Sequence, residues 1–455
     1  MEILLIAPPR PIPQKSDFPP IGLAYISAAL RGEGIDVRVL DASAFSWKTL
    51  AEPLRLHSPS VVGISCWTLE RGQVFKTAKL VKEILPKAKI VLGGHHATAF
   101  PEHMFINAYA DAVVIGEGEE TALELFRAML TRQSLENIRG IAYSENGRIH
   151  LTEHRDLIIN LDLIPYPDYA DFNLDDYLGL PEIKGRAASI MTSRGCPYRC
   201  IFCSGSKFWE RRWRSRSPEN VLGEIEWLYY DQKVRNFIFF DDNFTVQKDR
   251  AIQICQGIID RKLDIHFVAS SHVAHIDKEL LYWMKRGGCY RIDFGVESGT
   301  PEILDKIKKS QTVEQIEQTF ELVHEAGIKP RAFLIVGSPG ENEKTIDQTV
   351  SLMRRIKPYD SRTAEIMWVL PNTEIYELAK TQGLLTDDFW LKNNETLYYT
   401  CEHTLDELKL LRDHLMKETS RNEGTIKAYL EYLARKAYYN YPLLQRLRGL
   451  RKVFK

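Results

Sequence analysis

Short apolar segments alternate with amphipathic helical segments along most of this chain, and no other feature restricts its fold as strongly. Between residues 1 and 135, the segments "EILLIAP", "VVGISCW" and "AKIVLGG" fit buried strands. Helical spacing separates them, as in "GLAYISAALRGEG" and "VFKTAKLVKEILP". Strands that alternate with helices form a parallel sheet with helices on both faces. We therefore predict a doubly wound, Rossmann-like α/β domain over residues 1–135.

The alternation returns after an acidic stretch that prolines interrupt. Residues 136–185 lack a clear period and predict a linker that runs over the surface. Over residues 186–400 the pattern predicts six strand–helix units, fewer than the eight of a complete barrel. We expect a partial (β/α)6 barrel there, followed by a basic helical region over residues 401–455. A chain of 455 residues is long enough for two such domains.

Composition excludes several classes of protein. The formal net charge of −1 gives no indication of nucleic-acid binding. No apolar run approaches the ~18–20 residues needed to cross a bilayer, and the first residues lack a basic leader with a cleavage site. We therefore expect a cytoplasmic protein. Seven cysteines in a reducing compartment indicate a metal site or a catalytic role rather than disulfides.

Three of these cysteines follow the first predicted strand of the barrel. The segment "GCPYRCIFC" gives Cys196, Cys200 and Cys203 a C-x3-C-x2-C spacing. Barrel enzymes place their chemistry at this end of the strands. Structural zinc sites and most iron–sulfur cubanes have four protein ligands, so three thiolates on a cubane leave one iron open. The alternative is a zinc site with a histidine, namely His266, His272 or His275, as its fourth ligand.

The cysteine segment, "DFGVESG" and "VGSPGE" together resemble the motifs of the radical S-adenosylmethionine (SAM) enzymes. The resemblance covers roughly residues 185–375. It implies one [4Fe-4S] cluster on the three cysteines, with SAM on the open iron and a 5′-deoxyadenosyl radical as the reactive product. It also implies contacts to SAM from residues at the strand ends: Phe202, Asp241, Ser270, His272, Glu297, Ser298, Gly337 and Pro339.

Two of these assignments have alternatives. Many members of the family carry a basic residue where His272 stands, so the contact to the carboxylate of SAM is open. Asp241 and its neighbour Asp242 fit either the SAM site or a role in capping the next turn.

The first loop of the N-terminal domain disfavours a nicotinamide cofactor. Such a site needs Gly-x-Gly-x-x-Gly there, whereas this loop reads "APPRPIPQKSDFPP". A glycine pair after the fourth strand instead lets a large flat ligand lie against the backbone. With "ISCW" and "GEGE", these features resemble the cobalamin-binding domains that precede some radical SAM enzymes. The resemblance covers about the first 135 residues and implies contacts to cobalamin from Ser65, Trp67, Gly93, Gly94 and Glu117.

The same loop departs from that family in one respect. Residues 8–22 contain no histidine, so this loop offers cobalt no imidazole. Trp67, Leu69 or Arg71 is the alternative cover for that face of the corrin. A simpler interpretation is that the glycine pair only turns the chain and that His95 and His96 are ordinary loop histidines.

The two resemblances together imply a cobalamin-dependent radical SAM enzyme. We expect it to methylate an unactivated carbon of a natural-product or lipid-type small molecule, with an electron donor of the flavodoxin or ferredoxin type. The alternatives are a radical cyclisation or rearrangement without methyl transfer, and a zinc-binding, non-catalytic module. Residues 421–455 are basic, with interleaved tyrosine and leucine. They fit a solvated helical end or a helix on an anionic membrane, and the second interpretation favours a lipid or isoprenoid substrate.

Overall fold

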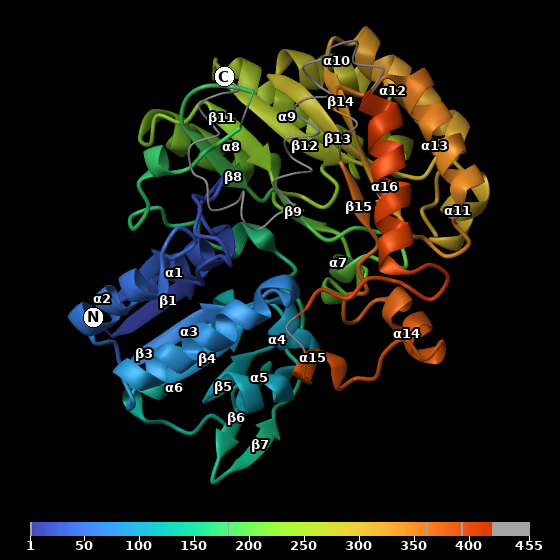
Figure 1. Ribbon diagram of the computed structural model, residues 1–455. Coiled ribbons are helices and arrows are strands. Elements are labelled where there is room, and N and C mark those ends of the chain that lie inside the picture. Colours follow the sequence, from blue (N-terminus) through green and yellow to red (C-terminus); the bar gives the residue numbers. More distant parts are fainter. Residues whose placement is uncertain (1, 181, 361–362, 393–394, 421–455) are drawn as a thin grey trace.

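The chain forms two lobes, each built on its own β-sheet (Figure 1). A computed structural model describes residues 2–180, 182–360, 363–392 and 395–420. The prediction of an α/β fold with a Rossmann-like sheet and a partial barrel is confirmed.

The first sheet has seven strands in the order β2-β1-β3-β4-β5-β6-β7. The first five strands along the chain are parallel, and β6 and β7 extend one edge in antiparallel fashion. Strand order reverses between β1 and β3, and doubly wound sheets bind ligands at this position. The strands are β1 (Ile3–Ala7), β2 (Val37–Asp41), β3 (Val61–Ser65), β4 (Lys89–Gly93), β5 (Ala112–Val114), β6 (Ile141–Glu145) and β7 (Arg148–Leu151).

Helices cover both faces of this sheet (Figure 1). On one face, α1 and α6 bury residues such as Leu23 and Phe126 against the strands. On the other face, α2, α3 and α5 bury residues such as Leu50 and Val74. Burial on both faces explains why the strands are continuous apolar runs. The helices are α1 (Ile21–Gly32), α2 (Trp47–His57), α3 (Arg71–Ile84), α4 (His95–Ala99), α5 (Pro101–Asn107) and α6 (Glu119–Thr131).

The second sheet has six parallel strands in the order β8-β11-β12-β13-β14-β15. It curls into a partial barrel, with its helices packed on the outer face (Figure 1). The strands are β8 (Ala187–Ile190), β11 (Asn236–Phe239), β12 (His266–Ser271), β13 (Cys289–Glu297), β14 (Lys329–Val336) and β15 (Ala364–Ile366). The helices that follow them are α8 (Pro218–Tyr230), α9 (Lys248–Asp260), α10 (Lys278–Arg286), α11 (Pro301–Lys306), α12 (Val313–Glu325) and α13 (Glu343–Ile356).

A short antiparallel ribbon stands apart from both sheets. It pairs β9 (Ser193–Arg194) with β10 (Arg214–Ser215), so that Arg194 lies opposite Arg214. Between the two strands the chain forms the cysteine loop and the one-turn helix α7 (Ser204–Phe208).

One predicted segment differs from the structure. Strands β6 and β7 lie within residues 136–185, which we expected to form a linker throughout. All four residues of β7 are exposed, so the short alternation in its sequence, RIHL, corresponds to no buried face. After Leu151 the chain is irregular, apart from the single turns η2 (Leu161–Leu163) and η3 (Leu174–Asp176).

After the barrel, the chain returns to the first lobe. Trp390 on α15 (Phe389–Lys392) is fully buried, and the guanidinium of Arg71 lies over its ring at 4.5 Å from the centroid. Asn107 Nδ2 on α5 donates a hydrogen bond to the carbonyl oxygen of Leu391 at 2.8 Å. This C-terminal segment therefore closes part of the seam between the lobes.

The remaining C-terminal helices cover the barrel. Helix α14 (Glu374–Thr381) follows its last strand, and α16 (Leu405–Ser420) packs against α13 and β15. The basic segment 421–455 lies outside the described residues. Within the described part of the chain, no helix is both long enough and apolar enough to cross a membrane.

Candidate functional site

The β9–β10 ribbon closes the base of the cysteine loop. Gly195 begins the loop with a φ of +87°, and a side chain at this position would overlap the carbonyl oxygen of Arg212. Only glycine therefore fits immediately before Cys196. The backbone N–H of Cys203 donates to the carbonyl oxygen of Cys200 at 3.2 Å, which turns the second half of the loop inward.

The three loop thiols lie within electrostatic reach of one another and of Lys309. Burial raises the pKa of Cys196 to about 11 and that of Cys200 to about 12. Such thiols ionise when a metal coordinates them. Among the described residues, no three His, Cys, Asp or Glu side chains converge on one point as ligands of a single ion would. A cubane holds each thiolate on a different iron, so it does not require the three thiols to converge on one point.

The histidines of the zinc alternative have other partners. His272 stacks on Tyr198, with ring centroids 3.9 Å apart, and its Nε2 lies 3.0 Å from the carbonyl oxygen of Lys309. His275 Nε2 is 2.9 Å from the hydroxyl of Tyr198. His266 begins β12, at the opposite end of the strand from His272. All seven cysteines are free thiols in this structure.

Glu297 ends β13 in a strained conformation. Its φ is +62°, and the pairing of β13 with β14 shifts register between Gly295 and Glu297. A non-glycine residue in this region costs energy, and such strain is concentrated at functional positions. The carboxylate is buried and lies 2.9 Å from Nζ of Lys309.

Lys309 is a site residue that the sequence analysis missed. Burial disfavours its charge, but the neighbouring Glu297 and thiols raise the pKa of Lys309, so the ammonium persists. A side chain on Gly295 would overlap both Glu297 Oε1 and Lys309 Nζ, so this glycine makes room for the pair. By contrast, burial lowers the pKa of His272 to about 4, which leaves the imidazole neutral. The cation beside the cluster loop is therefore Lys309 and not His272.

Ser298 and Ser270 point in different directions. The hydroxyl of Ser298 is fully buried, 3.4 Å from that of Thr349 on α13, so its side chain faces away from the barrel interior. Ser270 alternates with the outward-facing Ala269 on β12, which directs Ser270 to the interior.

The carboxylate of Asp241 binds the strand that leads into the cysteine loop. It accepts hydrogen bonds from the backbone N–H of Thr192 at 2.7 Å and from the hydroxyls of Thr192 and Ser193. This geometry gives Asp241 a structural role, although its partners lie in the segment before the cysteines and not in the next turn. Its neighbour Asp242 is exposed and accepts from the backbone N–H of Gly195 at 3.1 Å. Of the two carboxylates, only that of Asp242 faces the cluster loop with free surface.

The loop after β14 carries Gly337 and Pro339. Gly337 has a φ of +89°, and its N–H donates to the buried carboxylate of Glu341 at 2.5 Å. Burial raises the pKa of Glu341 to about 8, so the carboxyl group that binds this loop is largely protonated at neutral pH. Phe202, between the second and third cysteines, packs against an apolar cluster that includes Trp390.

The ends of the strands of the first sheet line a cavity of about 250 Å³. Four of the five residues that we expected to contact cobalamin, namely Ser65, Gly93, Gly94 and Glu117, are among its lining residues. Most of the wall is apolar, and Gly94, with a φ of +103°, lies too close to Cys66 for a side chain. A broad apolar slot against bare backbone fits a large flat ligand.

Trp67 lies outside this first cavity. It lines a neighbouring cavity of about 120 Å³ and is 39% exposed. Its ring meets that of Trp368 from the barrel edge to face, at 6.3 Å between centroids. Arg71, the alternative cover for the corrin, instead donates to the carbonyl oxygens of Thr68 and Glu395.

Glu117 lines the first cavity but is bound to the second lobe. One carboxylate oxygen accepts from Arg194 Nη1 at 2.6 Å, and the other accepts from Arg214 Nη1 at 2.8 Å and from the N–H of Ile158. Arg194 also reaches Glu119 at 2.5 Å. Both arginines come from the β9–β10 ribbon, so an ion-pair network joins the cobalamin cavity to the cysteine loop.

The two loops that frame the predicted cofactor sites also touch directly. His95, the first residue of α4, stacks on Phe208, the last residue of α7, with centroids 4.0 Å apart. Both residues line both cavities. Burial lowers the pKa of His95 to about 4, so the stacked imidazole is neutral.

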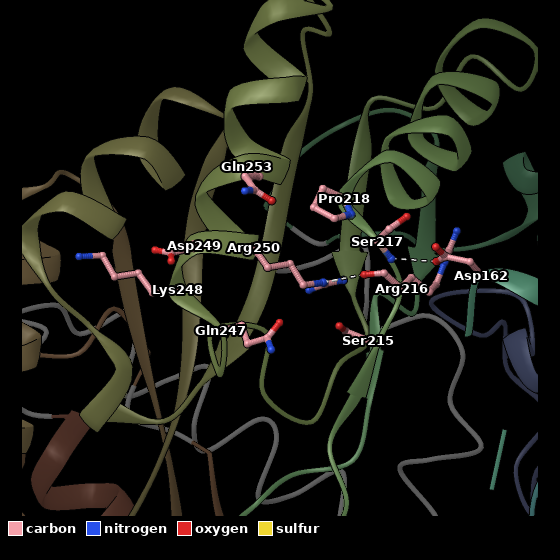
Figure 2. Close-up of a pocket in the computed structure, with 10 residues that line it drawn as sticks. All are labelled: Asp162, Ser215, Arg216, Ser217, Pro218, Gln247, Lys248, Asp249, Arg250 and Gln253. Carbon is pink, nitrogen blue, oxygen red and sulfur yellow. Dashed lines mark hydrogen bonds between the residues drawn. The ribbon is translucent and has the colours of Figure 1, made fainter. Parts of the chain in front are cut away.

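A further cavity, of about 660 Å³, opens on the outer rim of the barrel between the first turns of α8 and α9 (Figure 2). Arg250 lines it and donates to the carbonyl oxygens of Arg216 and Thr192 at 2.7 Å and 2.6 Å. The N–H of Ser217 donates to Asp162 at 2.8 Å. These groups support the strand that leads to the cysteines, and no predicted site residue lines this cavity.

Comparisons with known proteins agree with this geometry. Residues 190–353 match the family model described as the radical SAM superfamily, and residues 13–126 match the B12 binding domain. An uncharacterized methyltransferase of Pyrococcus horikoshii is 32% identical over 100% of this chain and 99% of its own length. The chain belongs to the radical SAM proteins with an N-terminal cobalamin-binding domain. This assignment replaces the zinc-binding alternative.

Other relatives of this radical SAM protein catalyse different reactions. The anaerobic magnesium-protoporphyrin IX monomethyl ester cyclase of Rubrivivax gelatinosus is 31% identical over 75% of this chain and 63% of its own length. The radical SAM methyltransferase TsrM from Kitasatospora setae, with cobalamin and a [4Fe-4S] cluster bound, has a TM-score of 0.70. That structure shares 20% identity and covers 84% of this chain and 79% of its own. The predicted cofactors, a [4Fe-4S] cluster, SAM and cobalamin, are confirmed as those of the family.

Proposed function

We propose that this enzyme methylates an unactivated carbon of a small molecule of the natural-product or lipid type. The contact of α4 with α7 carries the proposal. One helix begins directly after the glycine pair of the cobalamin cavity, and the other begins directly after Cys203. Because His95 and Phe208 stack between them, the two cofactors would face one shared space.

The cofactors, when bound, supply a hydrogen-abstracting radical and a transferable methyl group. The protein's task is then to position the reactants and exclude water. Cys196, Cys200 and Cys203 would hold the cluster. The Lys309–Glu297 pair presents one cation and one anion beside it, which suits the carboxylate and ammonium of the methionyl group of SAM.

The remaining predicted contacts would hold the rest of SAM. Phe202 lies between the second and third cysteines, and Gly337 and Pro339 lie on the loop after β14, so these residues would offer apolar and backbone contacts to adenine. Asp242 replaces Asp241 in this proposal, because the carboxylate of Asp241 is already used by Thr192 and Ser193. In the first lobe, Ser65, Gly93 and Gly94 would contact cobalamin, with Trp67 at its edge.

The experiment is an anaerobic turnover assay of the reconstituted enzyme with candidate substrates. Methylation predicts S-adenosylhomocysteine and 5′-deoxyadenosine in equal, substrate-dependent amounts. Deoxyadenosine alone, formed in a substrate-dependent manner, would instead support the second candidate, a radical cyclisation. The likeness to the protoporphyrin cyclase favours that candidate, and the likeness to two methyltransferases favours methylation.

A cysteine series tests the cluster assignment separately. Changing Cys196, Cys200 or Cys203 to alanine should remove most of the iron and abolish formation of deoxyadenosine, because the open cubane needs all three thiolates. Cys401→Ala is the control, since this free thiol lies outside the loop. Retention of iron and SAM cleavage by any loop variant would contradict the assignment.

The cluster needs an external source of electrons. We propose a donor of the flavodoxin or ferredoxin type, since the family's SAM cleavage is reductive. Reduction of the cluster by each purified donor, followed by electron paramagnetic resonance, tests this. A lipid or isoprenoid substrate and membrane contact through residues 421–455 remain part of the proposal, and liposome sedimentation with and without that segment tests the membrane contact.

A further inference from the structure

Two phenylalanines on the inner face of the partial barrel are unusually exposed. Phe240 follows β11 and has 56% of its surface exposed, and Phe333 on β14 has 37%. Their neighbours Phe239 and Leu334 lie in the core between the sheet and its outer helices. Side chains alternate along a strand, so Phe240 and Phe333 face the barrel interior.

Strand register places the two rings in adjacent layers of the interior. The pairings Phe239↔Ala269, Ser270↔Asp293 and Asp293↔Arg331 bring Phe240 level with Ser270 and Asp293. Phe333 pairs with Gly295, one layer nearer the mouth. Gly295 is also the residue over which the Lys309–Glu297 pair lies. The phenylalanines are therefore continuous with the proposed SAM site.

The floor of the interior, which reaches the layer of Phe240, carries charged groups that neutralise one another. Glu182 Oε1 lies 2.6 Å from Arg291 Nη1, and Arg291 Nε lies 2.9 Å from Asp293 Oδ1. Arg331 Nη2 lies 2.5 Å from the other oxygen of Asp293. The negative charges of the two carboxylates equal the positive charges of the two guanidinium groups. This floor therefore offers no unpaired charge to a charged ligand. A buried charge without a partner is strongly unfavourable.

We infer that the barrel interior receives an uncharged, apolar portion of the substrate, bounded by Phe240 and Phe333. This inference rests on the proposed function, because it assumes that the substrate reaches a radical formed beside Glu297. In this inference, the two phenylalanines select an apolar ring or chain of the substrate. Charged or strongly polar groups of the substrate remain outside these two layers.

The test uses the full-length enzyme with cluster, cobalamin and SAM bound, and equilibrium dialysis under anaerobic conditions. The probe is N-phenyl-1-naphthylamine, a neutral aromatic amine, compared with its sulfonated relative 1-anilinonaphthalene-8-sulfonate. We expect the wild-type enzyme to bind the neutral probe at one site and about tenfold more tightly than the sulfonate. Phe240→Ala and Phe333→Ala should each weaken binding of the neutral probe about tenfold, through loss of a buried ring contact.

Two controls exclude misfolding and non-specific binding. Tyr230→Ala removes an equally exposed aromatic residue from the outer helix α8 and should leave binding unchanged. Phe240→Leu keeps an apolar wall and should bind the neutral probe within about threefold of the wild type. Each variant should also keep the wild-type content of iron and corrin.

Either of two results overturns the inference: Phe240→Ala and Phe333→Ala bind the neutral probe like Tyr230→Ala, or the wild type prefers the sulfonate. The proposed function fails by a different measurement, the absence of reductive SAM cleavage. Probe binding does not depend on that cleavage, so the two failures are distinguishable.

Discussion

Arg194 Nη1 lies 2.6 Å from Glu117 Oε1, and this ion pair joins the two lobes. Both side chains are nearly inaccessible, at 5% and 4% exposed. Arg194 stands two residues before Cys196, and Glu117 lines the cobalamin cavity. The strand that leads to the cluster loop is therefore fixed to the edge of the second cofactor site.

Arg194→Met should lower the free energy of unfolding by roughly 3–5 kcal/mol, because it removes the cation that pairs with buried Glu119 and leaves buried Glu117 with Arg214 alone. Unfolding in guanidinium chloride, followed by tryptophan fluorescence, measures the loss. Arg139→Met is the control, because the pair that Arg139 forms with Glu153 is exposed and should contribute about 1 kcal/mol or less. Equal losses in the two variants would show that the interlobe network does not stabilise the fold.

Lys309→Met should weaken SAM binding at least tenfold, because it removes the only cation that we place beside the methionyl carboxylate. Equilibrium dialysis of the cluster-loaded protein with labelled SAM measures this. Lys308→Met offers a matched control, since the adjacent lysine is exposed and pairs with Glu374. If the two variants bind SAM equally, another cation holds the carboxylate.

Glu341 should make stability depend on pH. Because burial raises its pKa to about 8, the folded state keeps a proton that the unfolded chain loses above pH ~4.3. The stabilisation is complete below that pH and declines by up to about 1.4 kcal/mol per pH unit until the folded-state pKa is reached. Glu341→Gln should therefore match the wild type at pH 4 and be more stable than it at pH 8.

Urea unfolding at several pH values measures that difference. Glu343→Gln is the control, because Glu343 is exposed on the first turn of α13 and should leave the pH profile unchanged. A wild-type profile that is flat between pH 5 and pH 8 would disprove the assignment.

Gly93→Leu should abolish most cobalamin binding while the protein remains folded. A Cβ atom on Gly93 would make an ordinary contact with Val114 at 3.5 Å, and the rest of the side chain would fill the cavity. Corrin absorbance after reconstitution and gel filtration should fall below about a tenth of the wild-type value. Gly32→Leu, at an open position on α1, should bind normally. Full corrin content in the Gly93 variant would place cobalamin elsewhere.

The sequence predicted the architecture because both sheets are parallel and buried. Continuous apolar strands at regular spacing, such as β3 and β4, are visible without a structure. Strand β7 escaped detection because its four residues are all exposed, and α15 because it spans only four residues. Each element is only four residues long, which is too short for a reliable periodic signal.

The site could be predicted only where a local motif exists. Cys196, Cys200, Cys203 and the glycine pair stand in short contiguous segments. Lys309 could not be assigned, because "KIKKSQ" contains three lysines with no local difference and only the fold brings one of them to Glu297. Arg194 and Arg214 were missed for the same reason, since their partners lie more than seventy residues away in sequence. Asp241 and Asp242 illustrate a finer limit: strand alternation decides which of two adjacent carboxylates faces the loop.

The return of the chain to the first lobe has a consequence for engineering. Trp390 and its neighbours follow the barrel in sequence but complete the surface of the N-terminal lobe, where Arg71 and Asn107 hold them. A chimera that takes only about the first 150 residues from a homologue would thus combine one N-terminal lobe with a C-terminal segment that does not match its surface. Exchange of cobalamin modules between such enzymes should succeed only when the donor's equivalent of Phe389–Lys392 is transplanted together with its N-terminal half.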